Sequence, residues 1–395
     1  MDAEAEAIPL PATGPEAEPV ARRGAVRIHY LDAARSTLMS LGVVLHTAHM
    51  YDPLNKWKVT DASGNAFFHT LTAVIHLFRM PAFFMLSGFF CLMVLSKYGR
   101  SFLRIRLTRI VVPLVAAAVT LNTFQAYVLY RYHGAGAGFL DHYGEHGLLE
   151  LLLSGRWVSH LWFLINLAVY TVLAYYGYRW LSDRQGRLKS VLERMAALLV
   201  RPGGMLLFPL VAFVPWAIAV KIGIPVQSAV GFIDLGELVH YGMFFLLGMY
   251  MYHQRAALEH FTTARWTVVV PIPVCAFGLY ELSGMPAGSL HTLLEYCLGT
   301  FLSLSTSVLV LHFFKRFASL PSRLFAYMSE ASYSVYLFHH VTVMLLGIML
   351  MTAPINAYAK FSIVVVATFA IVLAIHHFLI LRIKPLRFLF NGKYS

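Results

Sequence analysis

Long apolar runs, separated by short polar segments, cover almost the whole chain. A helix needs roughly 20 predominantly apolar residues to cross the ~30 Å hydrocarbon core of a bilayer, and most of these runs approach or exceed that length. They predict helices at residues 31–50, 67–95, 107–130, 160–178, 204–221, 238–252, 266–282, 292–314, 330–352 and 359–381. The pattern therefore indicates an all-α fold, a polytopic membrane helix bundle with about ten transmembrane helices.

Residues 1–26 differ from the rest, because they are rich in Ala, Pro and Glu and contain no long apolar run. This composition predicts a disordered cytoplasmic tail. The segment also lacks the basic start and apolar stretch of a secretory signal peptide, so the first helix is expected to direct insertion. We expect residues 27–395 to form one transmembrane domain.

The distribution of charge predicts the orientation of this domain. The chain has 31 Lys and Arg against 19 Asp and Glu, a net charge of +12 that would suggest a nucleic-acid partner in a soluble protein. Most of the basic residues lie in the N-terminal segment, in every second loop after it and at the C-terminal end. Such loops stay in the cytoplasm. The sequence thus predicts both termini in the cytoplasm, a multi-pass protein of the bacterial inner membrane and no nucleic-acid partner.

An ionisable side chain inside a spanning helix is costly and marks a candidate functional site. Arg35 and His46 share one face of the first predicted helix and lie about 16 Å apart along its axis. Arg35 is expected near the cytoplasmic end of this helix and His46 in the outer half of the bilayer. Arg35 reaching the headgroups and His46 as an ordinary buried histidine would explain the same pattern.

Further polar and aromatic candidates lie in three segments. These are IHLFRMPAFFMLSGFF in the second helix, SHLWFL at the start of the fourth and SEASYSVYLFHH at the start of the ninth. The candidate substrate- and acyl-binding residues in them are His76, Arg79, Ser87, His160, Trp162, Glu330, Tyr333, Tyr336 and His339. Arg79 as a structural link between helices, Trp162 as an interfacial anchor and the tyrosines as packing residues are the alternative explanations.

The basic stretch that opens the third helix suggests phosphate binding. It contains Arg104, Arg106 and Arg109, and guanidinium groups bind phosphates well, although the positive charge of cytoplasmic loops alone would also explain it. The three cysteines have no metal-like spacing, and the motifs HExxH and GxSxG do not occur. We therefore expect no metal ion, and we exclude a membrane metalloprotease and a serine hydrolase.

Acyl transfer is the chemistry that these residues favour. A histidine can remove a proton from a hydroxyl group at neutral pH, and transfer of an acyl group from a thioester to a sugar hydroxyl needs such a base. His46 is our candidate for the base. Arg35 or Arg79 would stabilise the negative charge that develops on the donor or the tetrahedral intermediate.

Together these segments resemble the acyltransferase 3 family of multispanning bacterial O-acyltransferases, in particular its OpgC, or glucans biosynthesis protein C, branch. The likeness covers roughly residues 27–394. It rests on LDAARSTLMSLGVVLH, IHLFRMPAFFMLSGFF, RLTRIVVP, SHLWFL, ASYSVYLFHH and PLRFLFNGK. The resemblance implies that Arg35 and His46 are catalytic, and that Arg106 and Arg109, with Arg104 beside them, bind coenzyme A.

The resemblance also implies the substrates. The branch is expected to take a succinyl group from cytoplasmic succinyl-CoA and to place it on periplasmic glucans, so the expected partners are an acyl-CoA, a glucan and the lipid bilayer. One alternative is an O-acetyltransferase that acts on another cell-envelope glycan. Another is a membrane transporter, since intramembrane Arg and His residues also mark ion pathways, although no internal repeat suggests paired transporter halves.

Overall fold

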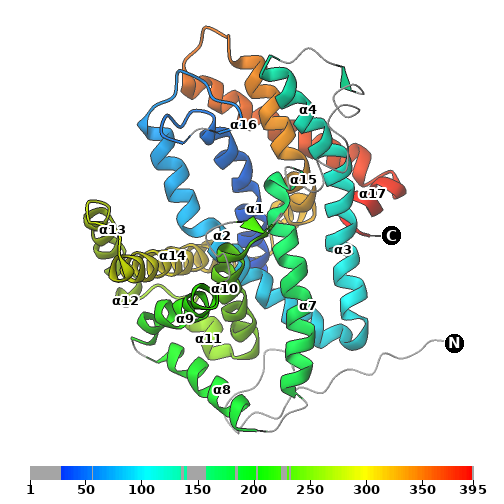
Figure 1. Cartoon of the computed structure of the whole chain (residues 1–395). Helices are drawn as coiled ribbons and strands as arrows, with labels where there is room; N and C mark the ends of the chain where they lie inside the picture. The colour runs from blue at the N-terminus through cyan, green and yellow to red at the C-terminus, as the bar shows by residue number, and fades with distance from the viewer. Residues whose placement is uncertain are drawn as a thin grey trace, which may run out of the picture.

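The computed structural model describes residues 28–55, 57–134, 138–139, 157–182, 186–201, 203–223, 229–230 and 233–393. The tail at residues 1–26 lies outside them, so its disorder stays a prediction. Each of the ten predicted ranges falls on a helix (Figure 1). These helices are α1 (His29–His49), α2 (Ala66–Tyr98), α3 (Phe102–Ala117) with the π-helical η3 (Ala118–Asn122) and α4 (Thr123–Tyr132), α7 (Trp162–Ser182), α9 (Phe208–Lys221), α10 (Leu235–His253), α12 (Trp266–Val269) with α13 (Pro271–Leu282), α14 (Ser289–Phe317), α15 (Arg323–Leu350), and α16 (Ala357–Ala374) with the π-helical η6 (Ile375–Ile380).

Shorter elements connect these helices. They are η2 (Gly99–Ser101), η4 (Ser159–Leu161), α8 (Arg187–Val200), η5 (Gly204–Leu207), α11 (Arg255–His260), α17 (Lys384–Asn391) and the two-residue strands β1 (Ala229–Val230) and β2 (Ile233–Asp234), which pair antiparallel. The regular structure of the described residues is helical apart from this one strand pair, which confirms the predicted fold class.

Six segments of the described chain are long and apolar enough to cross a bilayer. They are Ala66–Tyr132, Ser159–Ser182, Gly204–Lys221, Ser289–Phe317, Arg323–Leu350 and Ala357–Ile380. The 21-residue helix α1 is not among them, because Asp32, Arg35 and its histidines reduce its hydropathy. The structure therefore supports a multi-pass membrane protein, whereas ten crossings and cytoplasmic termini stay predictions.

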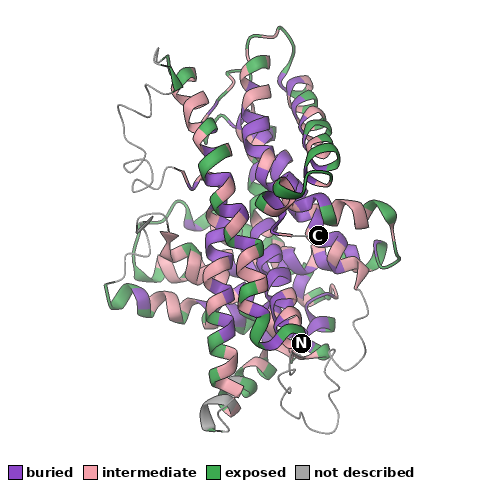
Figure 2. Cartoon of the chain, turned by 90° about the vertical axis from the view of Figure 1, so that its right-hand side faces the viewer, coloured by how far each residue is buried: buried purple, intermediate pink, exposed green. Residues whose placement is uncertain are grey.

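Helix α1 lies at the centre of the bundle, packed against α2, α14, α15 and α16. Its buried positions include the small residues Ala33, Ala34, Ser36 and Gly42, which allow neighbouring backbones to come close. Figure 2 shows that buried residues follow the inner helices and that exposed positions lie on the outer ones. Because α1 meets a partner on several sides, its residues are held by more than one neighbour.

Two glycines permit the close crossing of α2 and α10. A Cβ atom on Gly88 would lie 1.9 Å from the carbonyl oxygen of Phe245, and one on Gly248 would lie 1.8 Å from that of Met85. No side chain fits at these distances, so each helix presents a bare backbone to the other. This contact fixes the position of α2, the helix that carries Arg79.

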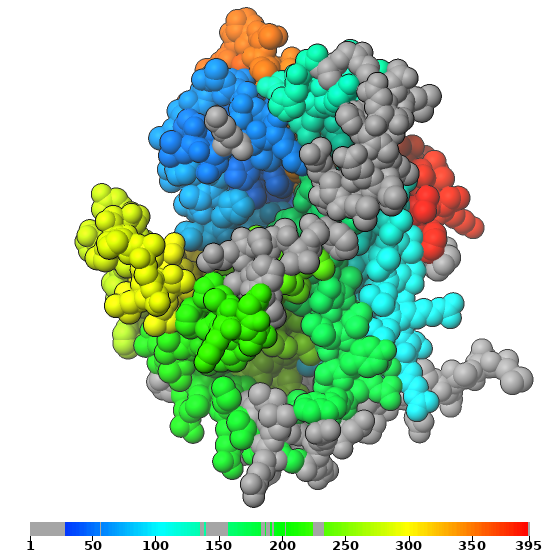
Figure 3. Space-filling model, in the orientation of Figure 1, coloured from blue at the N-terminus to red at the C-terminus, as the bar shows by residue number. Residues whose placement is uncertain are grey.

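The two ends of the molecule differ in the elements that they expose. The connections from α1 to α2 and from α15 to α16 lie at the top of Figure 1, which we call the upper end, and α8 and α11 lie at the opposite, lower end. Helices α12 and α13 project to one side (Figure 3). Because α1 runs towards the upper end, Arg35 lies on its lower part and His46 near its upper terminus.

A buried ion pair ties the upper loop, which we define as residues 50–65, to α16. Lys360 Nζ lies 2.8 Å from Asp61 Oδ2, and the two side chains are only 5% and 6% exposed. The ammonium group also donates a hydrogen bond to the carbonyl oxygen of Met351 at 2.8 Å. At this depth the two charges compensate each other, so the loop depends on both.

Replacing Asp61 by Ala is expected to lower the free energy of unfolding by about 3–5 kcal/mol, because the Lys360 ammonium would stay buried without its partner. Thermal denaturation of the purified protein in detergent measures the effect. The double variant Asp61→Ala, Lys360→Met is the control, and it should be more stable than Asp61→Ala alone. A double variant that is less stable than the single one would contradict this account.

Candidate functional site

Four imidazole rings from different parts of the chain meet near the upper end of α1. His46 lies in the last turn of α1, His160 in η4 just before α7, and His339 and His340 in the middle of α15. His46 is half-buried, and the other three are at most 7% exposed. We call these four residues the histidine cluster.

The rings of the histidine cluster are in mutual contact. The centroid of the His46 ring lies 4.8 Å from that of His340 and 5.3 Å from that of His339. His160 stacks on His340 at 4.7 Å, with 6° between the ring planes, and lies 5.5 Å from His339. The structure therefore brings the predicted residues His46, His160 and His339 together.

Hydrogen bonds define the protonation of His339. Its Nδ1 lies 2.7 Å from the carbonyl oxygen of Tyr336 and 2.9 Å from that of Val335. Since a carbonyl oxygen accepts and cannot donate, Nδ1 carries the proton, and Nε2 of the neutral ring keeps a lone pair. This Nε2 and the Nδ1 of His46 are buried without a hydrogen-bond partner among the described residues. Unpaired ring nitrogens are suited to accept a proton from a bound hydroxyl group.

Arg79 of α2 lies against a glycine that is one turn before His46. Its Nε donates a hydrogen bond to the carbonyl oxygen of Leu38 at 3.1 Å, and the residue is 8% exposed. A Cβ atom on Gly42 would lie 2.7 Å from Arg79 Nη2 and 3.1 Å from His339 Nε2. Gly42 thus leaves the space in which the guanidinium group and the imidazole ring meet, beside the histidine cluster.

Two tyrosines lie close to Arg79. The hydroxyl groups of Tyr336 and Tyr241 are within electrostatic range of its charge. Tyr336 also donates a hydrogen bond to the carbonyl oxygen of His160 at 2.6 Å, and Trp162 stacks on Tyr241 at 5.6 Å. Tyr336 therefore positions His160 directly, whereas Trp162 packs inside the bundle and supports Tyr241.

A chain of hydrogen bonds leads from the upper loop to His340. Lys58 Nζ donates to Ser159 Oγ at 2.5 Å, and Gln125 Nε2 donates to the same oxygen at 3.1 Å. The Gln125 amide oxygen accepts from His340 Nδ1 at 2.6 Å. Ser159 has a φ of 43°. A residue other than glycine adopts such a backbone conformation at a cost in free energy, which the surrounding structure must offset. The chain thus holds the His340 ring in one orientation.

The upper loop also covers the histidine cluster. The Trp57 ring stacks on His46 at 5.8 Å and meets the edge of His340 at 5.2 Å. Lys58 follows directly and interacts electrostatically with His160 and His340. The end of the site that faces away from Arg35 is therefore formed by loop residues.

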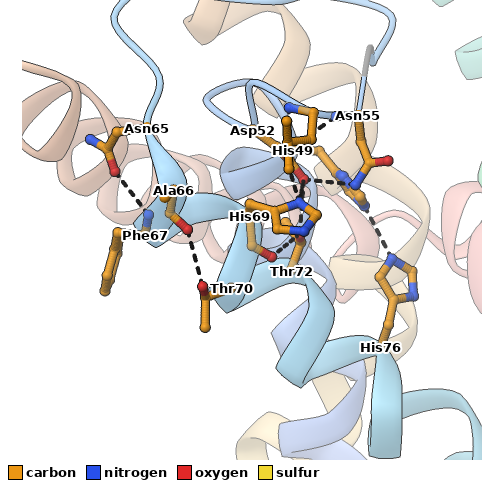
Figure 4. A network of polar contacts seen from close by, with 11 residues as sticks. His49, Asp52, Asn55, Asn65, Ala66, Phe67, His69, Thr70, Thr72 and His76 are labelled. Atoms are coloured by element: carbon orange, nitrogen blue, oxygen red, sulfur yellow. Dashed lines mark hydrogen bonds and ion pairs between the residues drawn. The ribbon is translucent and has the colours of Figure 1, made fainter. Parts of the chain in front are cut away.

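A network around Asp52 anchors this loop (Figure 4). Asp52 accepts hydrogen bonds from the His69 ring at 3.1 Å, the Asn55 amide at 2.9 Å and the Thr72 hydroxyl at 3.1 Å. Burial by itself would raise the pKa of Asp52, but the hydrogen bonds from Asn55, Leu54 and Thr72 lower it to about 2. The carboxylate is therefore charged at neutral pH, and it fixes the start of the loop directly after α1.

His76 does not join the histidine cluster directly. Its Nε2 lies 3.1 Å from Nε2 of His49 (Figure 4), and the His49 ring lies 6.1 Å from that of His46. Nitrogens at this distance share one proton, so one ring donates and the other accepts. His76 is thus linked to the cluster through His49.

Arg35 lies on the lower part of α1, away from the histidines. Its Nη2 donates a hydrogen bond to Ser329 Oγ of α15 at 2.7 Å and lies 3.4 Å from Asp32 Oδ1. The guanidinium group sits over the ring of Phe90 at 5.0 Å. About 16 Å of helix separates Arg35 from His46, so the two side chains do not act on the same atom.

Basic side chains converge near Arg35. Lys393 lies within electrostatic range of Arg35, Arg109 and Arg387. Arg106 interacts in the same way with Arg109. We define Arg35, Arg106, Arg109, Arg387 and Lys393 as the basic cluster.

Arg106 connects the basic cluster with α15. Its guanidinium group lies near the thiol of Cys91 and near Tyr333, whose hydroxyl is buried without a hydrogen-bond partner among the described residues. Arg104 is exposed, and no contact within the described chain joins it to the basic cluster. Two of the three predicted phosphate ligands, Arg106 and Arg109, therefore come together.

The C-terminal segment is docked on α3. A Cβ atom on Gly392 would lie 2.5 Å from the Cα atom of Arg109, and Gly392 has a φ of 60°. Both the space and the backbone conformation require glycine there. This contact brings α17 and Lys393 to the basic cluster.

One face of α15 joins the basic cluster with the histidine cluster. Tyr333, Tyr336 and His339 follow each other at a spacing of three residues, which places them on one side of a helix. Their rings lie 6.5 Å and 6.2 Å apart in turn. A line of aromatic side chains thus leads from Arg106 to His46.

Two predicted residues lie away from the histidine cluster. Ser87 is buried on α2, about two turns beyond Arg79 and towards the lower end. Glu330 is exposed and lies in electrostatic range of Lys393. Within the part of the chain that the structure describes, no group of three or more His, Cys, Asp or Glu is arranged to hold a metal ion.

Comparison with known families assigns the chain to a class of enzymes. A family model described as an acyltransferase domain, that of acyltransferase 3, matches residues 28–377. The chain belongs to the acyltransferase 3 family. The resemblance of the motifs is thereby confirmed, and the protein is a membrane acyltransferase.

Curated relatives of this acyltransferase are similar over nearly the whole length. Glucans biosynthesis protein C of Salmonella typhimurium strain LT2 is 26% identical over 381 residues, which cover 93% of this chain and 96% of the relative. Glucans biosynthesis protein C of Escherichia coli strain K12 is 26% identical over 382 residues, which cover 93% and 95%. No solved structure matches the chain.

The site contains residues that are not among the candidates from the sequence. His340 directly follows the candidate His339. Consecutive residues of a helix point about 100° apart, so the sequence suggests that only one of the two faces the site. Gly42 has a usable signal, since it precedes His46 by one turn on the same face. Trp57 and Lys58 lie in a loop without any motif, so no local signal identifies them.

Gly42→Ala is expected to reduce acyl transfer by this acyltransferase about 100-fold, because the new methyl group displaces the Arg79 guanidinium. The rate of acyl transfer from an acyl-CoA by the purified protein measures the effect. Gly177→Ala on α7 is the matched control, since a Cβ atom there meets nothing within 4 Å. Equal rates for the two variants would contradict the role assigned to Gly42.

Proposed function

We propose that this acyltransferase transfers a succinyl group from cytoplasmic succinyl-CoA to hydroxyl groups of periplasmic glucans, in the bacterial inner membrane. The observation that carries the proposal is the connection of the histidine cluster and Arg79 with the basic cluster along one face of α15. The name of the relatives, glucans biosynthesis protein C, supports a glucan as acceptor.

The basic cluster is the proposed donor-binding site. Coenzyme A carries phosphate groups, and guanidinium groups bind phosphates through charge-assisted hydrogen bonds. Arg106 and Arg109 would bind them, and the position of Arg35 beside Ser329 supports a role in donor binding as well. The thin pantetheine arm in extended form would reach along α15 from these cations to the histidine cluster.

His46 is the proposed general base. It takes the proton of a glucan hydroxyl while the hydroxyl oxygen attacks the thioester carbonyl carbon, and Arg79 stabilises the negative charge of the tetrahedral intermediate. The carbon–sulfur bond then breaks, and His46 passes the proton that it took from the hydroxyl to the thiolate of coenzyme A. The products are the glucan ester and free coenzyme A.

The position of the two clusters fits donor and acceptor on opposite sides of a membrane. With cytoplasmic termini, the side of the site with the basic cluster faces the cytoplasm, and the upper loop faces the periplasm. The glucan would then reach His46 past the upper loop. A water-soluble donor and a water-soluble acceptor can meet in this way although neither crosses the bilayer.

His46→Ala is expected to lower the rate of transfer by at least about 100-fold, since it removes the base. Mass spectrometry of the product measures it, with purified protein in nanodiscs, a glucan oligosaccharide and either succinyl-CoA or acetyl-CoA. A mass increase that corresponds to a succinyl group, lost in His46→Ala and kept in the exposed control His377→Ala, supports the proposal.

The same experiment separates the alternatives. Transfer of acetyl groups alone would keep the acyltransferase and change the donor. Transfer to another cell-envelope glycan, with none to the glucan, would change the acceptor. Wild-type protein that neither hydrolyses nor transfers any acyl-CoA would instead favour a transporter.

Arg109→Gln is expected to raise the KM for the acyl-CoA about 10-fold or more, because a charge-assisted hydrogen bond to a phosphate is lost. The rate of transfer at saturating donor should change little. Arg316→Gln, which removes an equal charge in the last turn of α14, is the control. A raised KM in both variants would indicate a general effect of surface charge and contradict a specific site.

A further inference from the structure

Lys58 is a half-buried cation that has no carboxylate beside it among the residues that the structure describes. Its Nζ donates a hydrogen bond to Ser159 Oγ at 2.5 Å, and no ion pair with Asp or Glu is found for it among the described residues. Burial lowers the pKa of Lys58 to about 8, with no neighbouring charge to compensate. The buried lysine at this end, Lys360, has Asp61 as its partner. A lysine in such a place is suited to bind an anion that the described part of the chain does not supply.

The position of Lys58 relative to the histidine cluster restricts what this anion is. Lys58 interacts electrostatically with His160 and His340, and the Trp57 ring next to it stacks on His46. An anion held by Lys58 therefore lies within reach of the residues that surround the reacting carbonyl group. It belongs to a substrate in the site.

Arg79 and Lys58 approach the histidine cluster from different parts of the chain. Arg79 contacts the carbonyl oxygen of Leu38 and the space over Gly42, which precede His46 on α1, whereas Lys58 belongs to the loop that follows α1. A thioester that arrives from the basic cluster meets Arg79 first. The part of the acyl group beyond its carbonyl carbon then points towards Lys58.

The hydrogen bonds around Lys58 hold it in place before any substrate binds. Ser159 Oγ accepts from both Lys58 and Gln125, and Gln125 in turn holds His340. The positive φ of Ser159 indicates that the surrounding structure enforces this arrangement. A cation that is positioned in advance loses little conformational entropy when an anion binds.

We infer that Lys58 binds the distal carboxylate of a dicarboxylic acyl group and thereby selects a succinyl donor over an acetyl donor. The inference rests on the proposed function, and it names Lys58 as the specificity residue of that reaction. Among the described residues, Arg79 is the other cation beside the histidines, but its place next to Gly42 and His339 suits the oxygen of the reacting carbonyl group.

The test compares two donors with one set of variants. Lys58→Met keeps most of the side-chain volume and removes the charge. We expect it to reduce kcat/KM for succinyl-CoA about 10- to 100-fold more than kcat/KM for acetyl-CoA, because only the succinyl donor loses a charge-assisted hydrogen bond. Lys58→Arg should restore much of the activity with succinyl-CoA. Lys221→Met, which removes an exposed lysine at the end of α9, is the matched control.

Each outcome of this comparison either supports or overturns the role of Lys58. A loss that is at least about 10-fold larger with succinyl-CoA than with acetyl-CoA, and that is recovered in Lys58→Arg, supports it. An equal loss with both donors would show that Lys58 is a structural residue, and would overturn the inference while the wild-type activity upholds the proposed function. Wild-type protein that transfers acetyl but no succinyl groups would overturn the proposed donor and the inference together.

Discussion

The structure of the site depends on the burial of the Arg79 guanidinium against the backbone of α1. A buried cation without a carboxylate partner must have its N–H groups satisfied by other acceptors, and the Leu38 carbonyl oxygen is one of them. The contact requires that residue 42 has no side chain. Because Arg79 also approaches His339, one interaction sets the relative positions of α1, α2 and α15. The close crossing of α2 and α10 at Gly88 and Gly248 then holds α2 from its other side.

Three separate hydrogen bonds hold residues of the histidine cluster in place. His339 donates to the backbone of its own helix, His340 donates to Gln125 of α4, and the backbone of His160 accepts from Tyr336. Imidazole rings that were free to rotate would offer no defined base. The rings of His339 and His340 are therefore held by hydrogen bonds, whereas the ring nitrogens of His160 have no hydrogen-bond partner among the described residues. The cluster exists only when α1, α4, η4 and α15 are assembled.

The separation of the basic cluster from the histidine cluster suits a reaction between two water-soluble molecules on opposite sides of a membrane. Phosphates are expensive to bury, so a donor that carries them is best held at one end while only its narrow arm enters the bundle. The tyrosines of α15 provide a partly polar lining along this line. The upper loop, anchored by Asp52 and by the Asp61–Lys360 pair, forms the other end of the site.

The sequence by itself determined the helices and much of the residue set, because apolar runs and helical periodicity are local properties. It placed His46, Arg79, His160 and His339 on helix faces that the structure brings together, and the basic residues of α3 at one end. Tertiary structure alone decided that His340 completes the cluster, that His76 is linked only through His49, that Arg104 stays outside, and that Trp57 and Lys58 cover His46. These outcomes depend on the fold of the upper loop and on the rotation of the helices relative to one another. Contacts between distant segments determine both features, and no local sequence pattern encodes such contacts.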